Sequence, residues 1–107
     1  MTDGKMLKDL QSAGGWFVGL YTGIIQSQLE RLETDREYKK RFIQKIHESE
    51  GRDKDLGGTT TRVNSVIRIV RSQKARAALE YVRHSHRIRE SDPLAVVYAA
   101  VTLDEMK

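Results

Sequence analysis

Basic side chains are concentrated between residues 59 and 90. This stretch contains eight Lys or Arg residues and two acidic residues, Glu80 and Glu90, and seven of the eight basic residues are arginines. In residues 1–58, by contrast, ten basic and ten acidic residues cancel. The planar guanidinium group makes forked contacts with phosphate or carboxylate, so this concentration indicates a polyanionic or acidic partner.

The arginines follow the period of a helix. Apolar residues recur every three or four positions from Val63 to Val82, which predicts one long helix over residues 60–89 with a single buried face. A kink of this helix near Ser72 is the alternative. The arginines fall on the opposite side, where Glu80 is the single acidic residue between positions 62 and 89. Like charges one helical turn apart repel, so this row destabilises the helix unless an anion offsets it.

We therefore expect this face to contact the phosphates of DNA or RNA without reading the base sequence. Three lysines of a preceding helix, predicted over residues 35–48, would extend the path. The predicted nucleic-acid contacts are Arg62, Arg68, Arg71, Lys74, Arg76, Arg83, Arg87, Lys39, Lys40 and Lys45.

Other interpretations fit the same charges. The basic face could dock on an acidic surface of a partner protein, which would make the chain an adaptor or an inhibitor. It could also be an ordinary solvated surface. A small transcription regulator would use residues 60–73 as its recognition helix, but the eleven-residue loop 48–58 is longer than the tight turn of a helix-turn-helix.

A second candidate site precedes the arginines. Gly58, Thr59 and Thr60 combine a flexible backbone with hydroxyl groups at a predicted helix start, where free N–H groups and the helix dipole favour an anion. This arrangement is a candidate cradle for a single backbone phosphate. The alternative is an ordinary loop in which one of the threonines is the N-cap.

No catalytic or metal-binding pattern is found in the sequence. The chain has no cysteine, which excludes disulfides and thiolate chemistry and favours a reducing cytoplasm. His84 and His86 point to different sides of a helix and cannot grip one metal ion together. We therefore expect neither enzymatic activity nor a cofactor, and no apolar run is long enough to span a membrane.

The elements that would position these residues form one all-α domain of 107 residues. Residues 1–14 are expected to be a loose lead-in. Four main helices are predicted, over residues 16–33, 35–48, 60–89 and 93–106. Thr34 is the expected N-cap of the second helix, and Asp92 followed by Pro93 is expected to start the fourth.

The apolar periodicity also predicts the core. Gly19 and Gly23 lie one turn apart in the first helix and predict a notch where another helix packs closely. The last helix is apolar nearly all round, so it is expected to be buried in this core or against another chain. The predicted core residues are Trp16, Phe17, Leu20, Ile24, Phe42, Ile46, Val66, Ile67, Val70, Tyr81, Val97 and Val101.

The segments WFVGL (residues 16–20) and QSQL (residues 26–29) resemble the opening helix of a known family. That family is the helical small subunits of type I CRISPR surveillance (Cascade) complexes. The resemblance implies a structural subunit of a ribonucleoprotein assembly in antiviral defence, with several copies lining the body of the complex. Their basic faces would hold the guide–target duplex or the displaced strand through phosphates. It assigns no role to individual residues of this chain.

Overall fold

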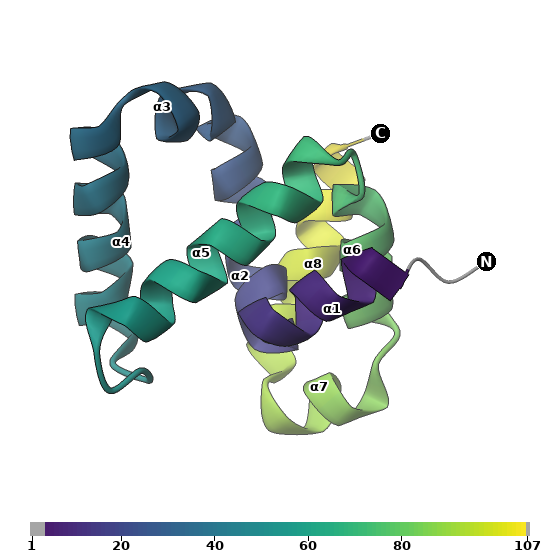
Figure 1. The fold of residues 1–107 in the computed structure, drawn as a ribbon. Coiled ribbons are helices and arrows are strands. Elements are labelled where there is room, and N and C mark those ends of the chain that lie inside the picture. The colour runs from purple at the N-terminus through teal and green to yellow at the C-terminus, as the bar shows by residue number, and fades with distance from the viewer. Residues whose placement is uncertain (1–3, 107) are drawn as a thin grey trace.

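The computed structural model describes residues 4–106, which form eight α-helices and no strand (Figure 1). The all-α class is confirmed, but the expected count of about four helices is wrong. Two predicted helices are interrupted and one helix was missed. The helices are α1 (Gly4–Ala13), α2 (Gly15–Ser27), α3 (Leu29–Thr34), α4 (Arg36–Glu50), α5 (Leu56–Arg71), α6 (Ala75–Arg83), α7 (His86–Ser91) and α8 (Pro93–Glu105).

The predicted helix over residues 60–89 is broken twice. Gln73 has a left-handed backbone (φ 61°), which ends α5 and turns the chain into α6. A second break precedes α7, where the side chain of Ser85 accepts a hydrogen bond from the N–H of Ile88 at 3.2 Å. Because each break rotates the following residues about the chain, the arginines of α5, α6 and α7 cannot form one row.

Helix α2 lies at the centre of the fold and packs against α8, α6 and α5. Phe17, Val18 and Ile25 are fully buried there. The notch at Gly19 is confirmed, because a Cβ at this position would lie 2.4 Å from the carbonyl oxygen of Ala95 in α8. A side chain on α2 at that point would push the two helices apart.

The expectation of a loose lead-in is wrong for residues 4–13, while residues 1–3 lie outside the described part of the chain. Residues 4–13 form α1, which packs along α5. Met6, Leu10 and Ala13 are buried at helical spacing. These three side chains make α1 part of the core rather than a tail.

Four predicted core residues are instead exposed. Ile24, Tyr81, Val97 and Val101 have exposed fractions of 49%, 51%, 55% and 48%. Tyr81 follows the break at Gln73, so it does not continue the buried face of α5. Helix α8 packs on α2, α6 and α7, and Val97 and Val101 lie on the side that these helices leave exposed.

The first residues of α4 and α8 are capped differently from the predictions. Asp35, not Thr34, caps α4, and its side chain accepts from the N–H of Tyr38 at 3.0 Å. The hydroxyl of Thr34 donates instead to the carbonyl of Glu30. Asp92 does precede Pro93 at the start of α8, as predicted, but its carboxylate pairs with Arg52 at 2.9 Å rather than capping the helix.

Candidate nucleic-acid interface

The proposed phosphate cradle is contradicted by the start of α5. The helix begins at Leu56, so Gly58, Thr59 and Thr60 lie within its first turns rather than before it. Asp55 is the N-cap, and its carboxylate accepts from the N–H of Gly58 at 3.1 Å. A carboxylate therefore occupies the place predicted for a phosphate, and a second anion there would be repelled.

The hydroxyls of this segment are also engaged. Thr60 donates to the carbonyl of Leu56 at 2.8 Å. Thr59, only 2% exposed, donates to Oδ2 of Asp53 at 3.0 Å. Because its single hydrogen is used there, the Thr59 oxygen must accept from Nδ1–H of His47, 2.8 Å away. Thr59 is therefore a buried connector and not a ligand for phosphate.

Arg62 is a structural residue in this same cluster. Its guanidinium forms an ion pair with Asp53 at 3.0 Å and donates to the carbonyl of Ala13 at 2.7 Å. It also lies 5.1 Å from the ring centre of Trp16. The Arg62 hydrogen bond lowers the pKa of Asp53, and the hydrogen bond from Thr59 acts in the same direction. Sequence reasoning missed this cluster because the loop holding Asp53 shows no recognisable motif.

The other two arginines of α5 also meet carboxylates from the first half of the chain. Nε of Arg68 lies 3.0 Å from Oδ1 of Asp9, and Nη2 of the same side chain donates to the hydroxyl of Ser65. Nε of Arg71 lies 3.6 Å from Oε2 of Glu33. The Arg71 pair is the looser one, because the arginine side chain is 60% exposed. These carboxylates remove much of the repulsion that the sequence pattern implied.

The remaining predicted cations lie elsewhere on the molecule. Arg76 donates to the carbonyl of Met106 at 3.1 Å, and Arg83 and Arg87 are exposed on α6 and α7. Lys74 lies in the break between α5 and α6. Figure 1 places α7 at the far end of the molecule from α3. The predicted single row of contacts is therefore wrong as a geometry, and its members are divided between separate surfaces.

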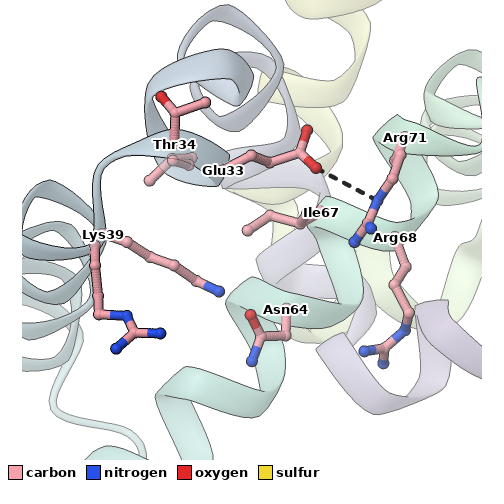
Figure 2. Close-up of a pocket in the computed structure, with 9 residues that line it drawn as sticks. Glu33, Thr34, Lys39, Asn64, Ile67, Arg68 and Arg71 are labelled. Carbon is pink, nitrogen blue, oxygen red and sulfur yellow. Dashed lines mark ion pairs between the residues drawn. The ribbon is translucent and has the colours of Figure 1, made fainter.

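A polar groove nevertheless lies between α3 and α4 on one side and α5 on the other (Figure 2). Its volume is about 580 Å³. Lys39 extends from α4 toward Asn64 of α5, while Arg68 turns away toward α1 (Figure 2). Four cations line the groove and Glu33 is its single acidic residue. The lining residues are Leu32, Glu33, Thr34, Arg36, Lys39, Asn64, Ile67, Arg68 and Arg71.

Helix α4 carries several cations that have no partner within the described residues. Within residues 4–106, five basic side chains of this helix form neither an ion pair nor a side-chain hydrogen bond: Arg36, Lys39, Lys40, Arg41 and Lys45. Four of them are divided between two sides of the helix, and Lys40 is exposed and lines neither groove. Arg36 and Lys39 line the polar groove, whereas Arg41 and Lys45 line a different groove toward α2. The predicted path required Lys39 and Lys45 to lie on the same side of α4, but they lie on different sides.

The described residues contain no group of three or more His, Cys, Asp or Glu side chains that could hold a metal ion. No helix within residues 4–106 combines the length and the apolar composition that crossing a bilayer requires. No protein-family model, curated protein or solved structure matches this chain.

Proposed function

We propose that this chain is a non-enzymatic subunit of a larger ribonucleoprotein assembly and binds a nucleic-acid backbone without sequence preference. The observation that carries the proposal is the polar groove, where Arg36 and Lys39 face Arg71 and Asn64 and have no partner among residues 4–106. Unpaired cations are free to replace the counterions of a phosphate backbone. The groove therefore takes the place of the arginine row as the centre of the interface.

The chemistry of the groove favours phosphate over bases. Arginine and lysine donate to phosphate oxygens, and the amide of Asn64 offers a further donor on the opposite wall. Arg71 is available because its pair with Glu33 is long, at 3.6 Å, and largely exposed. An exposed pair of this kind contributes little, so a phosphate can compete with Glu33 for the guanidinium.

The test is a fluorescence-anisotropy titration of labelled random oligonucleotides, as single-stranded DNA, duplex DNA and RNA, at about 50 and 200 mM salt. Log affinity should decrease with log salt for the wild-type protein. In the double variant Arg36→Gln/Lys39→Gln, the magnitude of this negative slope should be smaller by about two units. Arg83→Gln/Arg87→Gln is the matched control, since it removes two exposed charges from α6 and α7. That control should keep the wild-type slope.

Two results would count against the proposal. Absence of any salt-dependent binding by the wild-type protein would reject a nucleic-acid partner. If the magnitude of the slope decreases in the Arg83/Arg87 control and not in the groove variant, the interface lies on α6 and α7 instead. Circular dichroism of each variant would establish that α4 still folds, which we expect because neither Arg36 nor Lys39 pairs with another side chain in the described part of the chain.

A second candidate function is a protein-interaction module, an adaptor or inhibitor that docks on an acidic partner. It is favoured by the exposed apolar face of α8, where Leu94, Val97, Tyr98 and Val101 are 46–58% exposed at helical spacing. Contiguous apolar surface of this kind is typical of protein contacts. Such a module would ignore oligonucleotides at every salt concentration and would co-purify with its partner.

A further inference from the structure

The side of α4 that faces α2 borders a second groove, of about 550 Å³, with an apolar floor. Ile24 lies on α2 beside this groove with 49% of its surface exposed. Helix α4 packs mainly on α3 and α5, and the groove lies between it and α2. The lining residues are Tyr21, Ile24, Tyr38, Arg41, Phe42, Lys45, Ile46 and Ser49.

The two walls of this apolar groove are tied together at both ends. At one end, the hydroxyl of Tyr38 donates to Oε1 of Gln28 at 3.2 Å. At the other end, the hydroxyl of Tyr21 donates to the carboxylate of Glu50, the last residue of α4. These two bridges hold α4 at a set distance from α2. The groove is therefore preformed, which lowers the cost of ordering it around a ligand.

The shape of the groove fits a helix better than a compact molecule. Its lining residues on α4 run from Tyr38 to Ser49 at helical spacing, which is three turns or about 16 Å. An amphipathic helix places apolar anchors along one face over the same length. Ile24 also borders a second hollow, between α2 and α8.

The charge of the groove selects the kind of helix. Arg41 and Lys45 lie one turn apart on α4, line the groove and have no ion-pair partner within the described chain. Like charges at this spacing repel each other, and an acidic residue placed between them would relieve the repulsion. The lining residues include no carboxylate, and the carboxylate of Glu50 at one end already accepts from the hydroxyl of Tyr21. The charge complement must therefore come from the ligand.

We propose that this apolar groove binds an amphipathic helix of a partner protein, whose apolar anchors are flanked by Asp or Glu. The anchors pack on Ile24 and Phe42, and the acidic side chains pair with Arg41 and Lys45. The proposal does not depend on nucleic-acid binding, because Arg36 and Lys39 lie on the other side of α4.

The experiment is a selection of displayed helical peptides, each about 16 residues long, on the immobilised full-length protein. Selected peptides should carry Asp or Glu beside apolar residues spaced at i and i+4. Anisotropy titration should then give affinities at least roughly tenfold weaker in Arg41→Glu/Lys45→Glu and in Ile24→Glu. Arg36→Glu/Lys39→Glu is the matched control and should bind the peptide as tightly as wild type.

Exchanging the charges between peptide and groove tests the predicted ion pairs directly. A selected peptide with its flanking acids changed to lysine should prefer Arg41→Glu/Lys45→Glu over wild type. The proposal is overturned if selected peptides show no acidic preference, or if their binding is indifferent to both groove variants. It is also overturned if sedimentation of the protein alone reveals a dimer that Ile24→Glu dissociates, because the occupant would then be a second copy.

Discussion

Arg62 and Asp53 form a two-pronged ion pair, in which Nε of the guanidinium donates to Oδ2 at 3.0 Å and Nη2 donates to Oδ1 at 3.0 Å. Nη1 donates to the carbonyl of Ala13 at 2.7 Å. The pair thus joins the loop after α4, the middle of α5 and the end of α1. The arginine predicted to contact phosphate is used to hold three segments of the fold together.

Replacing Asp53 by alanine should lower the free energy of unfolding by about 2 kcal/mol, since Arg62 would lose a partner in a partly buried site. Urea unfolding followed by circular dichroism would measure the loss. Arg83→Ala, at an exposed position on α6, should stay within about 0.5 kcal/mol of wild type. Equal losses in the two variants would contradict the structural role of the pair.

The same pair should make stability depend on pH. The Arg62 hydrogen bond lowers the folded-state pKa of Asp53 below its ordinary value of 3.8, so the stabilisation is present above that value. It should be lost as the pH falls from 3.8 through the lowered folded-state pKa. The difference in unfolding free energy between wild type and Asp53→Ala should therefore shrink from about pH 5 to pH 3. A difference that stays constant over this interval would contradict the assignment.

Gly19→Ala should destabilise the protein by about 1–3 kcal/mol, because the added methyl group would lie 2.4 Å from the backbone oxygen of Ala95. A backbone atom cannot move aside as the end of a flexible side chain can, so α2 and α8 must separate. Gly4→Ala is the control, since a Cβ there meets nothing within 4 Å. Thermal or urea unfolding of both variants checks this prediction, and a neutral Gly19→Ala would indicate looser packing of the two helices.

Arg68 and Lys39 line one groove but should respond differently to mutation. Arg68→Ala leaves Asp9 without its partner and should lower the unfolding free energy by about 1 kcal/mol. Lys39→Ala removes an unpaired charge, so stability should change by less than about 0.5 kcal/mol. Oligonucleotide titrations of Lys39→Ala should lose about one unit of salt slope. Unchanged binding by this variant, with stability intact, would remove α4 from the proposed interface.

Much of the helical content could be predicted because its signals are local. The Asp92–Pro93 start placed α8 correctly, and the spacing of Gly19 and Gly23 predicted the close packing of α2. The sequence allowed a kink near Ser72 but did not predict a complete break there, since glutamine has no preference for the left-handed backbone that Gln73 adopts. Without that break, Tyr81 would have stayed on the buried face.

The sequence by itself determined the all-α class, the absence of thiol chemistry and the excess of arginine in the second half. Each follows from composition or from neighbours within a few turns. Only the tertiary structure decided which cations are available to a partner. Asp9 and Arg68 are 59 positions apart in sequence yet form an ion pair. The availability of a charge depends on distance in space, and the folded chain sets that distance.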